Sequence, residues 1–295
     1  MKIKIAGNSG YLGQLITQEL IDKGHQVSGI ERQLLYGDIK VLQQEISGSD
    51  IMINIAGAPI LQAWTAKNKE SIYNSRVRVT QQIVKAINAL PLEQRPKHFI
   101  QTSAIGIYKP GELHSELSTN FSTSYLGKLV CDWEGAMDTL HYSVEKTIFR
   151  LGLVLGQESK IIKRLSPLFR LGLGATIGSG TQAFPFIHER DLTRAFLAVI
   201  EGTLAPSTYN LVAPENIDNK AFSIALAKQL GRKIYFKIPA LVLKLQLGQA
   251  SQLLLESPQA SADKIMEANF DFQFPTIEES LKDIMSVTRM IAVVD

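Results

Sequence analysis

The stretch IKIAGNSGYLGQLITQELIDKG, residues 3–24, decides the fold of this chain. A short β-branched run leads into a loop with glycines at positions 7, 10 and 13, and an amphipathic helix follows and ends at Gly24. Gly7 permits a tight turn, Gly10 lets the backbone approach a pyrophosphate, and Gly13 allows close packing of helix on strand. The anion would lie at the helix N-terminus, where backbone N–H groups are free.

This strand–loop–helix pattern predicts that the loop binds a dinucleotide. Glycines that serve only a tight turn between strand and helix are the structural alternative. The predicted cofactor-binding residues of the loop are Gly7, Asn8, Ser9, Gly10, Tyr11, Leu12 and Gly13.

The end of the second predicted strand, at 25–31, bears on the choice of cofactor. Glu31 lies where an acidic group accepts hydrogen bonds from the adenosine ribose, which is typical of NAD sites. Arg32 is next to it, and a guanidinium there pairs with the 2′-phosphate of NADP or stacks on adenine. A solvated Glu-Arg pair at a strand end is the structural alternative. The choice between NAD and NADP therefore stays open.

Two further segments complete the predicted cofactor site. Asp38, in YGDI, is placed to accept a hydrogen bond from the adenine amino group. The strand predicted at 50–57 ends in NIAG, so that Asn54, Ala56 and Gly57 would pass under the adenosine side.

Short β-branched runs alternate with helical patterns through the first half of the chain, which predicts a parallel sheet with crossover helices. We expect strands at 3–7, 25–31, 50–57, 97–103 and 146–156, and helices at 11–24, 67–89 and 125–140. Three residues separate Ile30 from LLYGDI at 34–39, whereas a parallel crossover needs about a dozen. We therefore expect the usual second crossover helix to be missing and the segment 34–38 to be irregular or an abbreviated edge strand.

The pattern becomes irregular after residue 156, where a glycine-rich segment at 170–182 precedes several shorter helical stretches. Those helices are expected at 191–201, 220–230, 239–247, 260–268 and 277–285. The predicted fold is α/β, with a doubly wound Rossmann sheet and a smaller C-terminal α+β substrate lobe. The nucleotide-binding domain would span 1–156 with part of 183–212 interleaved, and the lobe 157–295.

The composition is that of a soluble globular protein, with 45% hydrophobic and 20% charged residues. The net charge is +3 with Lys and Arg scattered, which gives no nucleic-acid signal. A single cysteine, Cys131, excludes an internal disulfide framework and is typical of a reducing compartment. The N-terminus is not a signal peptide, and no stretch approaches the roughly 18 apolar residues of a membrane span. We expect a cytoplasmic protein that binds neither membrane nor nucleic acid.

Several segments, weak singly but specific in their order, carry a family resemblance. They are GNSGYLG, NIAGAPI followed by Trp64 and NSR (74–76), TSAIGIY (102–108), CDWE, FRLGLVLG, FRLGLGATIGSGTQ, FIHERDL (186–192) and LGQASQLLLESPQASADKIMEANFDFQFPT. Over nearly its whole length the chain resembles the extended or atypical short-chain dehydrogenase/reductases, and more narrowly the NAD-dependent epimerase/dehydratase-like proteins of the YfcH-type epimerase family. The resemblance implies binding of NAD or NADP, a small-molecule substrate and, by analogy, a homodimer through the helices at 67–89 and 125–140.

The resemblance also implies a catalytic trio. In the wider superfamily a serine hydrogen-bonds the substrate oxygen, a tyrosine exchanges the proton, and a lysine four residues later lowers the tyrosine pKa and holds the nicotinamide ribose. Here Ser103 matches the serine only with a one-residue shift, and Lys128 follows Tyr125 by three residues, with Leu129 at the usual lysine position. A core-facing tyrosine beside a solvated lysine is the alternative, and Tyr108 is a second candidate acid.

Other polar residues have structural explanations beside functional ones. A buried, hydrogen-bonded role is expected for His188, and Asp191 is expected to cap the helix that starts at Leu192. Arg150 and Arg170 would bind an anionic substrate or form ordinary salt bridges. No His/Cys/carboxylate cluster has metal-binding spacing, so no metal site is predicted.

These observations favour an oxidoreductase or epimerase that uses NAD or NADP on a small polar carbonyl or hydroxyl compound. The alternative is a catalytically impaired nucleotide-binding protein with a regulatory or interaction role, which the displaced Lys128 favours.

Overall fold

Six parallel strands form the central sheet, in the order β10-β6-β4-β3-β1-β2. The computed structural model describes residues 1–291, with side chains up to residue 286. The strands are β1 (Lys2–Ala6), β2 (Gln26–Ile30), β3 (Ile51–Asn54), β4 (His98–Ala104), β6 (Glu145–Leu151) and β10 (Thr208–Leu211). All of β3 and nearly all of β4 are buried, as strands of a parallel sheet covered on both faces should be.

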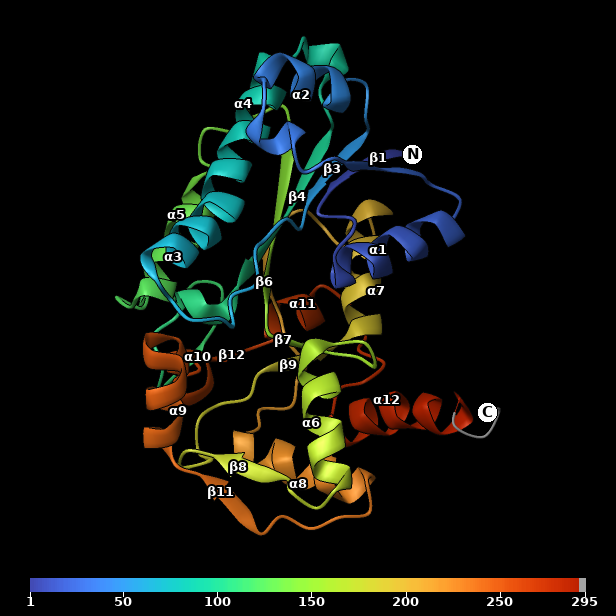
Figure 1. Cartoon of the computed structure of the whole chain (residues 1–295). Coiled ribbons are helices and arrows are strands. Elements are labelled where there is room, and N and C mark those ends of the chain that lie inside the picture. The colour runs from blue at the N-terminus through green and yellow to red at the C-terminus, as the bar shows by residue number, and fades with distance from the viewer. Residues whose placement is uncertain (292–295) are drawn as a thin grey trace.

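Helices cover both faces of the sheet (Figure 1). α1 (Tyr11–Asp22) and α7 (Glu189–Ile200) pack together on one face. α2 (Ile39–Ile46), α4 (Val79–Ala89) and α5 (Tyr125–Gly135) lie on the other face. The two apolar layers between helices and sheet are separate core clusters. The predicted α/β doubly wound sheet is therefore confirmed.

The connection between β2 and β3 differs from the prediction. We expected no second crossover helix, but a 3-10 turn at Leu34–Tyr36 leads into α2, which is that helix. The prediction was wrong because it assumed that the next strand along the chain pairs with β2. In the structure β2 is the edge strand, and the next strand, β3, pairs with β1. α2 buries Leu42 and Ile46 against α4 and the sheet.

The helix predicted at 67–89 is one path with a widened turn in its middle. α3 (Ala66–Tyr73) passes into a π-helical segment, Asn74–Arg78, and then into α4. π segments are rare and are frequently found at functional sites.

Several predicted element ends were wrong, among them those of α5 and β6. The helix predicted to reach residue 140 stops at Gly135. The strand predicted at 146–156 divides at Gly152, where a Cβ would lie 2.9 Å from the Pro185 carbonyl oxygen. Beyond it, β7 (Leu153–Leu155) leaves the main sheet and pairs with β9 (Phe186–His188).

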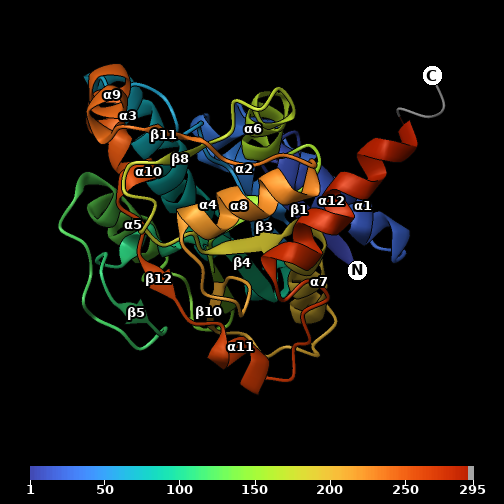
Figure 2. The same cartoon turned by 90° about the horizontal axis from the view of Figure 1, so that it is seen from below.

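The rest of the chain forms the smaller α+β lobe, seen at the bottom of Figure 1 and from below in Figure 2. Its elements are α6 (Lys160–Arg170), β8 (Ala175–Ile177), α8 (Asn219–Gln229), β11 (Phe236–Ile238), α9 (Ala240–Leu247), α10 (Gln252–Leu255) and α12 (Ile277–Ile291). β12 (Gln259–Ala260) pairs with β5 (Leu113–His114), and α11 (Asp263–Glu267) packs beside α7 and the sheet. Within residues 1–291 no helix has the length and apolar character needed to cross a membrane.

Candidate functional site

The candidate site lies where the strand order reverses. From β1 the chain moves to β2 on one side and then returns to β3 on the other, so β1 and β3 flank the switch point. Ligands of such sheets bind at the carboxyl ends of the strands at this point. The loops after β1 and β3 touch there, because a Cβ on Gly7 would lie 2.8 Å from the Ala56 nitrogen. Gly7 also has a φ of 93°, which favours glycine.

The glycine loop leaves the first helix open for an anion. The Gly10 N–H donates to the Gly7 carbonyl at 3.1 Å, and a Cβ on Gly13 would lie 2.2 Å from that same carbonyl oxygen. Gly10 precedes α1 without any side-chain cap, and the first turn holds no acidic residue. The first N–H groups of a helix have no partner inside it, so they are free to hold a diphosphate. The loop therefore fits a dinucleotide.

Three of the four side chains between the glycines, those of Asn8, Tyr11 and Leu12, contact other parts of the protein. That of Asn8 lies against β2, since a Cβ on Gly29 would approach it to 2.1 Å. Leu12 packs against the core. The main-chain carbonyl of Ser9 accepts a hydrogen bond from Gln14 Nε2 at 3.3 Å. The Tyr11 hydroxyl donates to Glu189 at the start of α7, and burial together with this carboxylate raises the pKa of Tyr11. The backbone of the loop and the exposed Ser9 side chain are left for an anion.

An open depression of about 510 Å³ follows β2, lined by Glu31, Arg32, Gln33 and Tyr36. The Glu31 carboxylate accepts from Gln33 Nε2 at 2.6 Å. The Arg32 side chain is exposed and has no hydrogen bond or ion pair within the part of the chain that the structure describes. Asp38, predicted to meet adenine, caps α2 by accepting from the Lys40 N–H at 2.8 Å.

Asn54 shapes the loop after β3 from behind. It is buried, and its amide donates to Thr80 Oγ1 at 3.0 Å and to Gln101 Oε1 at 2.9 Å. Its oxygen accepts from the Ala56 N–H at 3.1 Å, which fixes the turn toward Gly57. The backbone at Ala56 and Gly57 is thus presented to the cleft, while the Asn54 side chain faces the interior.

Two of the predicted catalytic side chains are held in a buried polar network. Ser103 Oγ donates to Glu134 Oε1 at 2.5 Å, and Ser103 is 3% exposed. Tyr108 is 1% exposed; its hydroxyl donates to Asn210 Oδ1 at 2.8 Å and accepts from Arg150 Nη1 at 2.7 Å. Burial raises the pKa of Tyr108, against the effect of Arg150. Neither hydroxyl faces an open cleft in this arrangement.

The same network settles the role of Arg150. Its guanidinium binds both oxygens of Glu134, at 2.8 Å from Nε and 2.7 Å from Nη2, so the salt-bridge interpretation is confirmed. Glu116 also belongs to the network, accepting from the Asn210 N–H at 2.6 Å. The Arg170 side chain lies exposed at the end of α6.

Tyr125 and Lys128 are not brought together. The Tyr125 hydroxyl donates to the main-chain oxygen of Lys69 at 3.1 Å, and its ring lies 5.0 Å from the Trp64 ring. Burial raises the pKa of Tyr125, while the charge of Arg76 opposes this rise. Lys128 is exposed, and no hydrogen bond or ion pair of its side chain occurs within residues 1–291.

Comparison with known proteins identifies the family to which this chain belongs. Residues 3–211 match the model of the NAD dependent epimerase/dehydratase family. The chain belongs to this family. The finding confirms the predicted resemblance. Residues 238–284 match a domain of unknown function, DUF1731.

Individual members of the epimerase/dehydratase family are similar over almost the whole chain. The epimerase family protein SDR39U1 of Mus musculus is 30% identical, over 97% of this chain and 100% of the mouse protein. The crystal structure of human SDR39U1 with NADPH is 29% identical, with a TM-score of 0.90 over 97% of this chain and 99% of the human one. UDP-glucuronic acid 4-epimerase from Bacillus cereus, in complex with NAD, shares the fold at 17% identity and a TM-score of 0.75, over 100% and 99% of the two chains.

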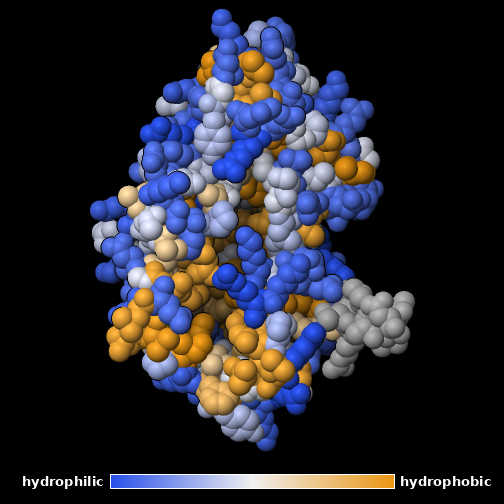
Figure 3. All heavy atoms as spheres, viewed as in Figure 1, coloured by the Kyte–Doolittle hydropathy of each residue, from blue (hydrophilic) through white to orange (hydrophobic). Residues whose placement is uncertain are grey.

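The surface of this family member is hollowed between the sheet and the smaller lobe (Figure 3). Hydrophobic residues gather along the lower side of the hollow, and the exposed leucines of α9, Leu241 and Leu245, belong to the lobe on that side.

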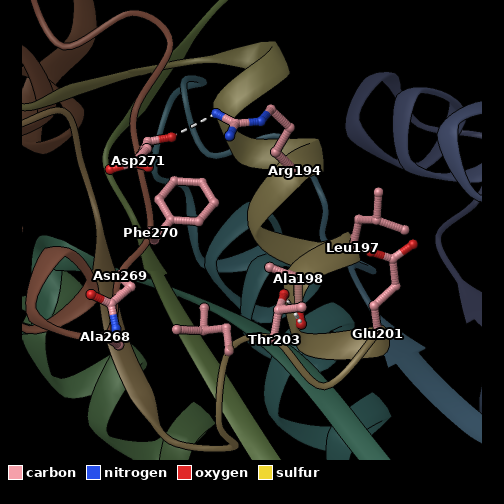
Figure 4. Close-up of a pocket in the computed structure, with 10 residues that line it drawn as sticks. Arg194, Leu197, Ala198, Glu201, Thr203, Ala268, Asn269, Phe270 and Asp271 are labelled. Carbon is pink, nitrogen blue, oxygen red and sulfur yellow. Dashed lines mark hydrogen bonds between the residues drawn. The ribbon is translucent and has the colours of Figure 1, made fainter.

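A second pocket, of about 240 Å³, lies between α7 and residues 268–271 (Figure 4). Arg194 crosses it to donate to the Asp271 carbonyl at 2.7 Å, over the Phe270 ring. The C-terminal part of α7 lines this pocket and leads toward the amino end of β10, whereas the glycine loop follows the carboxyl end of β1. The pocket therefore lies at the opposite end of the parallel strands from the glycine loop. We do not assign it to the candidate site.

The start of α7 differs in part from the prediction. His188 is buried as expected, and its Nδ1 caps α7 by accepting from the Arg190 N–H at 3.2 Å. Asp191 was predicted to be the cap, which is wrong because the helix begins at Glu189. Asp191 is buried instead and accepts from the N–H groups of residues 273 and 274 at 2.8 and 2.9 Å.

Sequence reasoning missed two residues of the site, Glu134 in CDWE and Arg76 in NSR. Both segments served only the family resemblance. Arg76 lies between Ser75 and Val77, whose burial is known only from the structure. The chemical partners of such a residue come from other parts of the fold and have no local pattern.

Proposed function

We propose that this protein binds NADPH at the switch point between β1 and β3 and reduces a small carbonyl compound. The observation that carries the proposal is the glycine loop, whose free helix N-terminal amides suit a diphosphate. The reduced nicotinamide, when bound, would supply the hydride.

The preference for NADPH rests on the residues after β2. Glu31, which would favour NAD, already accepts a hydrogen bond from Gln33. Arg32 is a cation without a protein partner among the described residues, beside the open depression. A guanidinium suits a phosphate, so the 2′-phosphate of NADP would find its counter-charge there. That human SDR39U1 was crystallised with NADPH supports the same choice.

The reducing direction rests on Tyr125. Because burial raises its pKa, the phenol is protonated at neutral pH and suits a proton donor. As hydride reaches a carbonyl carbon, the oxygen gains negative charge and takes the phenol proton. A substrate oxygen would replace the Lys69 carbonyl as the partner of the hydroxyl.

A nucleotide-binding protein without turnover is the second candidate function. The observation that favours it is the state of the predicted trio: Ser103 and Tyr108 are held in internal hydrogen bonds, and Lys128 is exposed. Such a protein would bind the cofactor and signal through a partner.

The test is calorimetric titration of the purified chain with NADPH and with NADH, followed by the absorbance of the reduced nicotinamide during incubation with a carbonyl panel. We expect NADPH to bind about tenfold more tightly than NADH or better. Arg32→Gln should remove this difference, whereas Lys40→Gln, an exposed cation of α2, should leave it.

The outcomes separate the candidates. Oxidation of NADPH that is lost in Tyr125→Phe supports the reductase. Binding without turnover across a panel of apolar and polar carbonyls, and no effect of Tyr125→Phe, supports the second candidate. If neither dinucleotide binds, both functions are refuted.

A further inference from the structure

The helix that carries Tyr125 provides no cation beside it. Leu129, at the position where the superfamily has a lysine, is 2% exposed. It lies in an apolar cluster with Val77 and Trp133. Lys128, the nearest lysine in the sequence, is exposed. If Tyr125 works with a fixed positive charge, that charge has to come from another element.

Arg76 is placed to provide it. It lies in the π-helical segment Asn74–Arg78, and its guanidinium lies against the loop after β3, where a Cβ on Gly57 would come within 3.1 Å of Cζ. Nη1 donates to the Ala58 carbonyl at 3.1 Å, and Cζ lies 5.3 Å from the centre of the Trp133 ring. The loop at Gly57 flanks the switch point, so the guanidinium lies beside the predicted cofactor site.

The guanidinium is only partly used by the protein. Nη1 contacts the carbonyls of Ala58 and, at 3.5 Å, Ile72. Nε and Nη2 have no acceptor, and no carboxylate pairs with Arg76, within residues 1–291. Burial lowers the pKa of Arg76 to about 10, so it stays charged at neutral pH. A half-buried cation without an acidic partner is costly unless a ligand completes it.

We propose that Arg76 supplies the fixed positive charge of the reaction site, in place of the lysine that Leu129 replaces. The inference rests on the proposed function. The guanidinium would favour the phenolate of Tyr125 and would offer its free N–H donors to the bound cofactor. The electrostatic link between Arg76 and Tyr125 acts in both directions, since each stabilises the charged form of the other.

Lys69 is the other cation near Tyr125 and provides the matched control. Its Nζ lies 4.8 Å from the centre of the Tyr125 ring and donates to Gln249 Oε1 at 2.7 Å. Lys69 thus sits over the ring face with its charge already engaged by an amide. A general loss of positive charge around Tyr125 would show equally in variants of Lys69 and Arg76, whereas the proposal concerns Arg76 alone.

The test is ¹⁹F NMR of the full chain labelled with 3-fluorotyrosine, with the residue 125 resonance assigned from Tyr125→Phe. In Arg76→Gln we expect this resonance to titrate at higher pH than in the wild-type chain, because the phenolate has lost a cation. Arg76→Lys should restore most of the difference, and Lys69→Gln should change it little. NADPH affinity, measured by calorimetry, should fall about tenfold in Arg76→Gln, which matches the loss of a charged hydrogen bond.

A purely structural role predicts a different pattern. If Arg76 only holds the loop at Ala58, Arg76→Gln will lower the melting temperature but leave both the Tyr125 titration and the NADPH affinity of the folded protein unchanged, and the inference is overturned. If the wild-type chain does not bind NADPH, the proposed function fails first, and the titration still reports whether Arg76 acts on Tyr125.

Discussion

The carboxylate of Glu134 lies between Ser103 Oγ and the guanidinium of Arg150, and Arg150 in turn reaches the Tyr108 hydroxyl. Four polar side chains from β4, the turn after it, α5 and β6 thus satisfy one another inside the fold. A buried ion pair of this kind contributes little net stability when intact, but removing one partner leaves an uncompensated charge. At the scale of the residue, the hydroxyl groups of Ser103 and Tyr108 are therefore part of the internal hydrogen-bond network of the fold.

Truncating the carboxylate tests this network. Glu134→Ala should lower the free energy of unfolding by about 3–5 kcal/mol, because Arg150 would remain buried without its partner. Ser103→Ala removes one hydrogen bond and should cost about 1–3 kcal/mol. Urea denaturation of both variants measures the two losses. Equal, small losses would show that Arg150 does not depend on Glu134.

Two glycines of the loop should respond differently to the same substitution. In Gly13→Ala the new Cβ would lie 2.2 Å from the Gly7 carbonyl oxygen, so the free energy of unfolding should fall by about 3 kcal/mol. In Gly10→Ala the nearest atom is 3.4 Å away, so stability should change by less than about 1 kcal/mol. The Gly10 Cβ would instead crowd the diphosphate, and NADPH affinity should fall about tenfold or more. Urea denaturation and calorimetry measure the two effects, and an unchanged NADPH affinity in a folded Gly10→Ala would refute the loop as the binding site.

At the scale of the element, the N-terminus of α7 joins the sheet to the C-terminal helix. The buried carboxylate of Asp191 receives the backbone N–H groups of Gln273 and Phe274. His188 and Arg190 lie 3.4 and 3.3 Å from the carboxylate of Asp283 on α12. Two acidic groups, Asp191 and Asp283, thus attach the segment 273–283 to the N-terminus of α7.

Removal of the Asp191 carboxylate should release this attachment. Asp191→Ala leaves the two N–H groups without acceptors, which should cost about 2–4 kcal/mol in the free energy of unfolding. Asp191→Asn keeps one acceptor oxygen and should lose less. Hydrogen exchange should rise across residues 271–286 in the alanine variant. Unchanged exchange there would mean that packing of Phe274 on His188 is sufficient to hold the segment.

At the scale of the whole molecule, two buried histidines couple folding to pH. His98 in β4 and His188 at the start of α7 are nearly inaccessible, and burial lowers the pKa of each to about 4 from 6.5. Below pH 6.5 the unfolded chain binds protons that the folded chain does not. Stability is therefore full above this pH and is lost as the pH falls toward about 4.

Each histidine should lower the free energy of unfolding by at most about 3 kcal/mol across this window. Urea denaturation at a series of pH values should give a slope that becomes smaller in His98→Gln, in His188→Gln and most of all in the double variant. The carboxylates that titrate nearby are common to all four proteins, so the difference in slope isolates the histidines. Identical slopes in all four would show that neither histidine is neutral in the folded chain.

The sequence by itself determined the alternation of strands and helices, the glycine loop and the family. These features depend on hydrophobic periodicity and on glycine positions within short contiguous stretches. The sequence did not reveal the crossover helix α2. That helix is expected only once the strand order shows that β3 lies beside β1 and not beside β2. The division near residue 156, the homodimer and the cytoplasmic location stay predictions.

Only the tertiary structure decided what the polar side chains do. From its place in TSAIGIY, Tyr108 was a candidate catalytic acid. In the structure its hydroxyl donates a hydrogen bond to Asn210, 102 residues further along the chain. Arg76 lies beside Gly57 because a π turn and the end of β3 meet at the switch point. A local pattern fixes the shape of the backbone, but a hydrogen bond or a charge pair needs two groups, and here the second group arrives from a distant part of the chain.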